Sequence, residues 1–444
     1  MNKRVLAVTI GLAIAAGTAP AWANIGMENI AAGVIAEGHG GTAIAVGDDT
    51  SVMNTNPALL SNIENNRMDA NMTMMFPEYS YKSAYEDTSG MKPIFVIPTM
   101  GLAWKQTDRM HLGVAFFNEG GSGTDYGPIR TKDTAMLGSA GTMTEYFSMF
   151  GYMVVTPTMA YQATDNLSLG ISAQPGYAMA RMKMPFSMSN LYPGFGDIWS
   201  ADMNMHDYNY RTKIGAVYTV NEAVGVGFAY TTKADINLRG TARMQTPSGN
   251  NGYMTGDAAA DMGWPSSFKV GAYWDMRGMG MQRMSLDIER INWSEYYTSV
   301  PFRMTHIVMN GSSNIPTPMS MDMNLGWTDQ TAYKLGFEQP FGDMVTMRMG
   351  WVHGRSPVPD NGILAIMNPI VEDHYTMGMG IYPTKSFEIN MAMTYGVGHK
   401  QTNNSSDTII GHFGSSTAPV SSDMNGTTIG MKFYTMSMGI GYKW

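Results

Sequence analysis

The chain ends in FYTMSMGIGYKW, residues 433–444, a stretch in which apolar and polar side chains alternate. A period of two places successive side chains on opposite faces of a β-strand. The apolar face would carry Tyr434, Met436, Met438, Ile440, Tyr442 and Trp444, and the polar face Thr435, Ser437, Gly439, Gly441 and Lys443. A half-buried strand of a soluble sandwich also alternates, but its solvent face normally carries more charge. The stretch therefore favours a membrane β-barrel strand, apolar toward lipid and polar toward the lumen.

The same alternation recurs in earlier stretches, at residues 284–289, 345–351 and 387–397. Short polar turns, each joining two strands of a hairpin, are predicted at 164–166, 221–223, 277–280, 341–343 and 384–386. Long segments rich in Gly, Ser and Asn are predicted to be loops, at 119–151, 181–207 and 399–427. Short turns on one rim and long loops on the other are typical of outer-membrane barrels. The pattern from Met68 to Trp444 predicts an all-β, antiparallel transmembrane barrel of roughly fourteen strands.

The composition narrows the class of protein further. Of 444 residues, 14% are charged and none is Cys, which excludes a disulfide-stapled scaffold and a Cys-based metal or redox site. The net charge of -8 provides no excess of positive charge for binding nucleic acid. The 45 Met residues raise the question of Cu(I) binding, since thioethers are soft ligands. Most of them stand where Leu or Val would serve, so we interpret them as adaptable apolar wall and predict neither a metal nor another cofactor.

The first residues have the form of a secretory signal peptide. Lys3 and Arg4 precede an apolar run, residues 5–16, and Ala21-Trp22-Ala23 is a small-x-small cleavage site. The run is too short to span a bilayer as a helix. We therefore predict a signal peptide over 1–23 and export to the outer membrane of a Gram-negative cell.

The stretch that follows, GGTAIAVGDDTSVMNTNPALL at 40–60, fits neither helical periodicity nor alternation. A barrel of about fourteen strands is too wide for its own inward side chains to fill. We therefore expect residues 24–66 to fold inside the lumen as a hatch, and residues 67–444 to form the barrel.

Taken together, these segments resemble the FadL/TodX family of outer-membrane transporters of long-chain fatty acids and other hydrophobic compounds. The hatch stretch with its Asn-Pro-Ala element is one match. The others, in chain order, are DNLSLGISAQPGYA (165–178), INWSEY (291–296), TMRMGWVHGRSPVPDNG (346–362) and MSMGIGYKW (436–444). The resemblance covers essentially the whole mature chain.

The resemblance implies a passive route for hydrophobic compounds. Extracellular loops would capture the substrate, a lumenal site would bind it, and it would leave sideways through the wall near a kink in an early strand, coupled to hatch movement. Burial of each methylene contributes about 0.8 kcal/mol, so an apolar relay suits such substrates.

The hatch supplies the first candidate residues. From spacing alone, Asn56, Pro57 and Ala58 favour an ordinary Asx-type turn. The resemblance reverses this preference, because the three residues match the family's hatch motif. Asp48 and Asp49 are adjacent in an irregular segment and point apart. Turn capping or a salt bridge to a lumenal Arg is therefore favoured over a metal site or a general-acid pair.

Candidate substrate-binding cations lie on the strands. Alternation turns Arg348 inward between lipid-facing methionines, either to hold a substrate carboxylate or to pair with a carboxylate such as Asp287, Glu289 or Asp49. Arg181 and Lys183 are the next candidates. Thr328 stands where some family members carry Lys, and this departure favours an uncharged hydrocarbon, although the resemblance still implies fatty acids as the default substrate.

Two other functions remain as alternatives, a general polar porin and an outer-membrane lipid hydrolase. The sequence holds no His-Glu-x-x-His, Gly-x-Ser-x-Gly or phosphate-loop motif, so no enzyme activity is predicted. The expected partners are a hydrophobic small molecule, outer-membrane lipid and lipopolysaccharide. The barrel-assembly machinery would recognise the last strand through Trp444. A monomer is expected.

Overall fold

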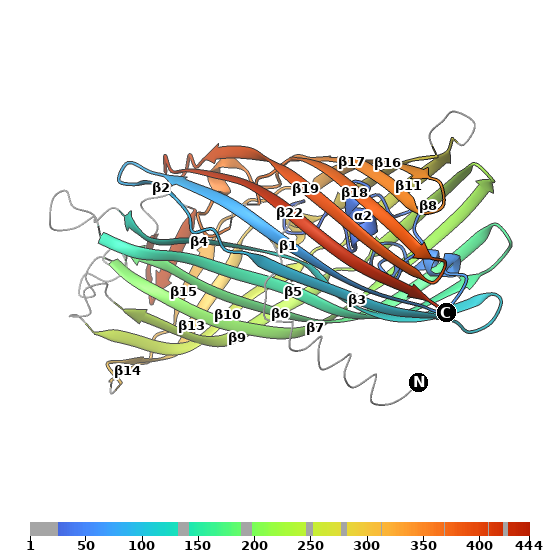
Figure 1. Cartoon of the computed structure of the whole chain (residues 1–444). Helices are drawn as coiled ribbons and strands as arrows, with labels where there is room; N and C mark the ends of the chain where they lie inside the picture. The colour runs from blue at the N-terminus through green and yellow to red at the C-terminus, as the bar shows by residue number, and fades with distance from the viewer. Residues whose placement is uncertain are drawn as a thin grey trace.

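The structure, a computed structural model, describes residues 25–131, 142–187, 198–245, 252–276, 282–311, 313–367, 369–406, 408–420 and 425–444. The predicted signal peptide, 1–23, lies outside the described residues. The strands close into one antiparallel ring, seen side-on in Figure 1. Among the described residues, no helix reaches the length and apolarity that crossing a membrane requires.

The ring is a 14-stranded barrel, as the alternation predicts. Ten staves are single strands: β1 (Arg67–Lys82), β3 (Phe95–Lys105), β4 (Met110–Thr131), β5 (Thr142–Gln162), β6 (Leu167–Ser187), β7 (Ile198–Asn221), β17 (Val345–Gly354), β18 (Asp373–Thr384), β19 (Phe387–Thr402) and β22 (Thr428–Lys443). Four staves have two segments each: β8 (Val224–Thr231) with β9 (Ala234–Gln245), β11 (Ser267–Asp275) with β10 (Tyr253–Trp264), β12 (Arg283–Ile291) with β13 (Val300–Met309), and β16 (Gln330–Phe341) with β15 (Met319–Met323). The first and last strands pair from Arg67↔Lys443 to Lys82↔Thr428 and so close the ring.

Short strands extend the long-loop end of the barrel. They are β2 (Asp87–Ser89), β14 (Ser313–Ile315), β20 (Ile409–Phe413) and β21 (Ser416–Pro419). Of these, β2 pairs with β1, and β20 pairs with β15. They lengthen the wall beyond the band of lipid-facing apolar side chains.

The two faces of the strands follow the predicted alternation. In β22 the five alternate apolar side chains from Tyr434 to Tyr442 are exposed on the outside, as is Trp444 after the strand, while Thr435 and Ser437 are buried. In β17, Met347 and Met349 are exposed and Arg348 is 6% exposed. Apolar side chains therefore line the outside and polar ones the lumen, as a lipid-embedded barrel requires.

Two of the predicted long loops are wrong. Much of 119–151 belongs to β4 and β5, and much of 181–207 to β6 and β7, which pair far beyond the apolar belt. Glycines within β4 accompany shifts in register near Gly120 and Gly127, so the chain continues as bulged strand where its composition suggests a loop. The third, 399–427, begins in β19 and contains the short hairpin of β20 and β21.

Residues 25–66 lie inside the ring, near the end that carries the short turns (Figure 1). They form helix α2 (Val34–Gly38), helix α3 (Val52–Thr55) and the 3-10 helix η1 (Pro57–Asn62), joined by irregular segments. Hydrogen bonds reach them from β1, β6, β7, β12, β16, β18, β19 and β22. The barrel wall therefore surrounds this segment on all sides.

Candidate functional site

The Asn56-Pro57-Ala58 element packs directly against the wall strands β6 and β7. Asn56 Oδ1 accepts from the Ala58 N–H at 3.1 Å, and Asn56 Nδ2 donates to Ile44 O at 2.6 Å and Ala216 O at 3.2 Å. Pro57, without an N–H to satisfy, is the first residue of η1. The side chain of Asn56 thus ties its own turn, a second loop of the segment and strand β7 together.

Glycines in the wall make this approach possible. A Cβ at Gly215 of β7 would lie 1.9 Å from Asn56 Oδ1, and one at Gly170 of β6 would lie 2.3 Å from the Ala58 nitrogen. Any larger side chain at either position would displace the turn. The wall is therefore shaped to this element.

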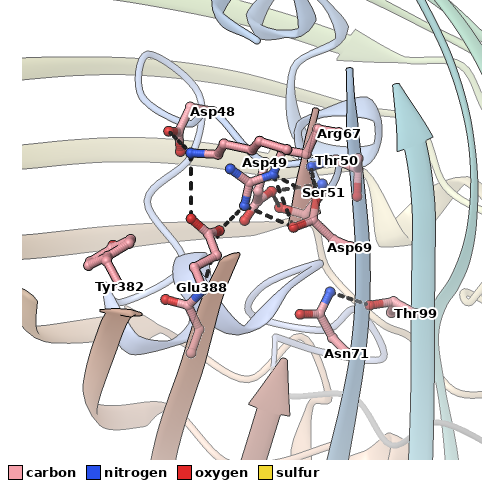
Figure 2. A network of polar contacts seen from close by, with 12 residues as sticks. Asp48, Asp49, Thr50, Ser51, Arg67, Asp69, Asn71, Thr99, Tyr382 and Glu388 are labelled. Carbon is pink, nitrogen blue, oxygen red and sulfur yellow. Dashed lines mark hydrogen bonds and ion pairs between the residues drawn. The ribbon is translucent and has the colours of Figure 1, made fainter. Parts of the chain in front are cut away.

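The acidic pair of the inner segment belongs to a polar network at the short-turn end (Figure 2). Asp49 Oδ1 accepts from the Ser51 N–H at 2.7 Å and from the Ser51 hydroxyl, so it caps a turn. Burial, and then the nearby Asp69 carboxylate, raise the pKa of Asp49. Asp48 Oδ2 lies 3.8 Å from Lys443 Nζ on the last strand.

Wall residues complete this network. Arg67 of β1 pairs with Asp69 at 2.8 Å and with Glu388 of β19, and it lies between them in Figure 2. Asp69 Oδ2 in turn accepts from the Thr50 N–H at 2.9 Å. Asp48 and Asp49 therefore belong to the seam where the first strand, the last strand and the inner segment meet.

Other inward-facing side chains of the wall bind the inner segment at further points along the barrel axis. Asp287 accepts from the N–H groups of Ala43 and Ile44 at 2.7 and 3.2 Å, and Lys334 donates to Ile30 O at 2.9 Å. In α2, Glu37 accepts from four wall hydroxyls, those of Thr73, Thr394, Thr435 and Ser437. Sequence reasoning did not single out Lys334 or Glu37, although alternation places Lys334 on the inward face of its strand.

Arg348 lies in the lumen near the same end but has a different partner from those expected. Its Nε donates to Glu338 Oε2 at 2.8 Å, and its Nη2 donates to Tyr382 Oη at 2.9 Å. Glu338 faces Arg348 directly across the β16–β17 hairpin. Asp287 and Asp49, two of the expected partners, instead bind backbone N–H groups of the inner segment.

Arg181 and Lys183 lie away from Arg348, on the outer face of β6. Arg181 Nη2 is 3.2 Å from Asp202 Oδ2, and Lys183 Nζ is 2.6 Å from Glu145 Oε2. Their neighbours Met182 and Met184 are the residues that point inward. The structure therefore does not bring the three predicted cations together.

Apolar space lies in the long-loop half of the lumen. Two cavities that share Phe302 have mainly apolar linings in which methionine is the most frequent residue, and we call them together the methionine chamber. Its methionines include Met182, Met205, Met262 and Met323 in the first cavity, and Met203, Met244, Met304 and Met319 in the second. The connection between β17 and β18 folds inward against the first cavity, where it contributes Ile366 and Met367. Thr124 of β4 donates to Ala365 O at 3.0 Å and holds that connection in the lumen.

An aromatic cluster separates the chamber from the inner segment. Trp264, Trp293, Trp327 and Tyr297 are each at most 1% exposed, with ring centroids 4.7 to 6.0 Å apart. The tight fit leaves room only for glycine at 26, because a Cβ there would lie 2.6 Å from the Trp293 ring. The start of the inner segment therefore packs directly beneath the aromatic rings.

The barrel wall is interrupted between β3 and β4. The two strands pair from Lys105↔His111 only as far as Met100↔Phe116. Beyond that point β3 continues to Phe95 against β1, and β4 continues to Thr131 against β5. We call this interruption the wall break.

Residues 27–29 cover the edge that β3 leaves free on β4. Asn29 N donates to Glu119 O at 3.2 Å, Gly121 N donates to Met27 O at 2.9 Å, and Glu28 bridges to Gly120. A cavity at the wall break is lined by Ile97 and Thr99 of β3, Asn118 of β4 and residues 29–33. The inner segment, the wall break and an internal cavity therefore meet at one place.

A family model described as outer membrane protein transport protein (OMPP1/FadL/TodX) matches residues 12–436. The chain belongs to this family. The family and its solved members are transporters and channels rather than enzymes. No curated protein sequence matches the chain.

Solved structures share the family fold at low sequence identity. The Pseudomonas putida toluene transporter TodX has a TM-score of 0.73 at 16% identity and covers 93% of this chain and 99% of its own. The Ralstonia pickettii toluene transporter TbuX has a TM-score of 0.70 at 17% identity, with 93% and 98% covered. A Pseudomonas aeruginosa FadL homologue has a TM-score of 0.71 at 14% identity, with 94% and 99% covered.

Two features of this FadL/TodX family member carry no sequence signal that we could use. The wall break depends on where one ladder of hydrogen bonds stops, and the inward fold of the β17–β18 connection depends on long-range contacts such as Thr124 with Ala365. The chamber's methionines, by contrast, lie at the inward positions of alternating strands. Alternation would have assigned most of them correctly.

Proposed function

We propose that this FadL/TodX family member carries neutral hydrophobic compounds inward across the outer membrane and releases them sideways through the wall break. In this proposal residues 1–23 are the signal peptide, 24–66 the hatch and 67–444 the barrel. The observation that carries the proposal is the end of the β3–β4 ladder at Met100↔Phe116, beside a cavity that both strands and the hatch line.

The methionine chamber supports capture of an apolar compound. Its lining side chains are unbranched and flexible, so they adapt to ligands of different shape. Transfer of apolar surface from water contributes about 25 cal/mol per Å² buried, which favours entry without an energy source. The solved relatives TodX and TbuX are toluene transporters.

The distribution of charge supports neutral substrates over fatty acids. Inward cations already have carboxylate partners within 4.0 Å: Arg67, Arg211, Lys269, Lys334 and Arg348. Lys213 donates to the Asn54 carbonyl of the hatch. A substrate carboxylate would therefore have to displace an existing partner or remain unpaired at a cost of several kcal/mol.

Passage to the wall break requires the start of the hatch to move. Residues 27–29 bind β4 mainly through backbone hydrogen bonds, each with a net contribution of about 1 kcal/mol. Their release would open the cavity toward the aromatic cluster and leave the rest of the hatch attached through Asn56. A local movement is therefore sufficient.

Two substitutions in one strand test the lateral route. Ile97→Trp fills the cavity at the wall break, whereas Val96→Trp places the same side chain on the lipid-facing side of β3. Uptake of a labelled aromatic hydrocarbon is measured in cells with intact lipopolysaccharide that lack other members of the family. We expect Ile97→Trp to abolish most uptake and Val96→Trp to retain it, with equal amounts of folded barrel. Equal uptake by both variants would refute release through this break.

A further inference from the structure

The lipid-facing side of the barrel carries methionines in two continuous rows. One row crosses five neighbouring strands through the paired positions Met349, Met377, Met393, Met436 and Met74. The second row, two residues further along each strand, consists of Met347, Met379, Met391, Met438 and Met72. We call these ten residues the methionine belt.

The belt faces outward and is flanked by rows of other residue types. Met349 is 60% exposed and Met377 58%, and five further belt residues are also exposed. On one side lies an aromatic row, with Tyr375, Tyr395 and Tyr434 in register, and on the other a row with Ile381, Ile389 and Ile440. Aromatic rows mark the boundary between membrane and water, so the belt lies within the apolar zone.

The opposite side of the barrel lacks such rows in the part that the structure describes. On β6, β7, β8, β11 and β12 the exposed large apolar residues are branched or aromatic, for example Leu169, Ile171, Val226, Phe268 and Leu286. Lipid contact alone is satisfied by those side chains. The concentration of thioethers on β17, β18, β19, β22 and β1 therefore calls for a chemical explanation.

The thioether is the chemical group that distinguishes Met from Leu or Ile. It is oxidised to a sulfoxide, which converts a flexible apolar side chain into a polar one. Buried methionines such as Met53 and Met254, both 0% exposed, are shielded from any reagent in the lipid or the lumen. The belt residues are shielded only from reagents that do not enter the bilayer.

We propose that the methionine belt is a sulfoxidation site for small neutral oxidants that partition into the outer membrane, with hypochlorous acid as the type case. The oxidant transfers its oxygen atom to the sulfur. Sulfur loses two electrons, chlorine gains them, and chloride leaves together with the proton. The belt consumes oxidant at the lipid boundary before the oxidant reaches the methionines of the chamber.

Oxidation of the belt also affects the seam of the barrel. The rows cross the junction of first and last strands at Met72↔Met438 and Met74↔Met436. Sulfoxides there place polar groups among lipid chains, an arrangement that lipid-facing positions disfavour. We expect the oxidised barrel to lose resistance to heat.

The test uses the whole protein in vesicles of saturated phosphatidylcholine, titrated with hypochlorous acid and then digested for mass spectrometry. Belt residues such as Met436 should be oxidised severalfold more than Met53 at the same dose, and unfolding in urea should remove the difference. Chloramine-T, an anionic oxidant, should oxidise Met91, which lies outside the belt and is 60% exposed, but spare the belt. Equal oxidation of belt and buried methionines in the folded protein would overturn the proposal.

A pair of variants tests the consequence for stability. The first replaces four belt residues by Leu: Met391, Met393, Met436 and Met438. The matched control replaces four inward residues by Leu: Met182, Met203, Met205 and Met244. After limited oxidation, the heat-modifiable gel shift should fall to lower temperature in wild type and in the control but not in the belt variant. An unchanged transition in oxidised wild type would overturn the claim that the belt governs the seam.

Discussion

The two halves of the lumen are built on opposite principles. Around the proposed hatch, at the short-turn end, charged and polar contacts fix the inner segment to the wall, and the backbones approach so closely that only glycine fits, as at Gly215 and Gly170. In the methionine chamber the lining consists mainly of apolar side chains, many of them flexible methionines. The difference teaches that the short-turn half holds the inner segment in one arrangement, whereas the chamber half can accept ligands of many shapes. A hatch requires a single fixed arrangement, whereas a site for varied hydrophobic compounds requires an adaptable lining.

The sharpest way to break this comparison is to add one methyl group on the hatch side. Gly215→Ala places a Cβ 1.9 Å from Asn56 Oδ1 and should weaken hatch docking by about 1–3 kcal/mol through overpacking. We expect new ion conductance in planar bilayers and reduced hydrocarbon uptake. Gly398→Ala is the control, because the nearest atom to its Cβ is 3.5 Å away. If both variants conduct no more than wild type, close packing does not hold the hatch.

Removal of the hatch contact from the other side should have a smaller effect. Asn56→Ala deletes the bonds to Ile44 O and Ala216 O, each with a net contribution of about 1 kcal/mol. The barrel should keep its heat-modifiable gel mobility while uptake falls. Asn62→Ala, which removes one exposed bond to Gly47 O, is the control and should keep uptake near the wild-type level. Wild-type uptake by Asn56→Ala would leave this residue with a turn role only.

Sequence reasoning succeeds where a local period decides the structure. Alternation assigns the outward face of β22 and the inward direction of Arg348, and it predicts the strand number. The same alternation, combined with a predicted turn, also indicates the partner of Arg348. The turn predicted at 341–343 places Glu338 opposite Arg348, and that is the carboxylate Arg348 binds.

Other features depend on contacts between segments far apart in the chain. The glycines of β4 suggest a loop by composition, but pairing with β5 keeps the segment extended as bulged strand. The wall break exists because β3 turns toward β1 while β4 stays with β5. No local pattern in either strand encodes that divergence.

On the chamber side, an equivalent change should matter much less than on the hatch side. Met205→Leu conserves volume and apolarity, so it should cost less than about 1.5 kcal/mol and alter hydrocarbon affinity only slightly. Met205→Lys at the same position introduces a charge and should abolish binding. Ligand titration in detergent, followed by tryptophan fluorescence, measures both. A large loss in Met205→Leu would mean that the chamber is as specific as the hatch interface.

The smallest expected effect concerns Arg348, which is already paired. A fatty acid and its methyl ester are compared for binding at neutral pH, in wild type and in Arg348→Ala. Because Glu338 and Tyr382 occupy the guanidinium, neither protein should prefer the free acid, and the ratio of affinities should be the same in both. A preference for the acid that disappears in Arg348→Ala would assign Arg348 as a carboxylate partner and contradict the neutral-substrate proposal.

The most direct test of the account is to map where a hydrophobic compound resides along its path. An aromatic hydrocarbon that carries a photoreactive diazirine is bound to the protein in vesicles, irradiated, and located by mass spectrometry of labelled peptides. The account predicts labels on chamber strands β10 and β13 and on residues 95–99 of β3, with the β3 label lost in Ile97→Trp and the chamber label retained. Labels on Asp49, Arg67 and Glu388 at the short-turn end, with none on β3, would show passage through the hatch and contradict lateral release.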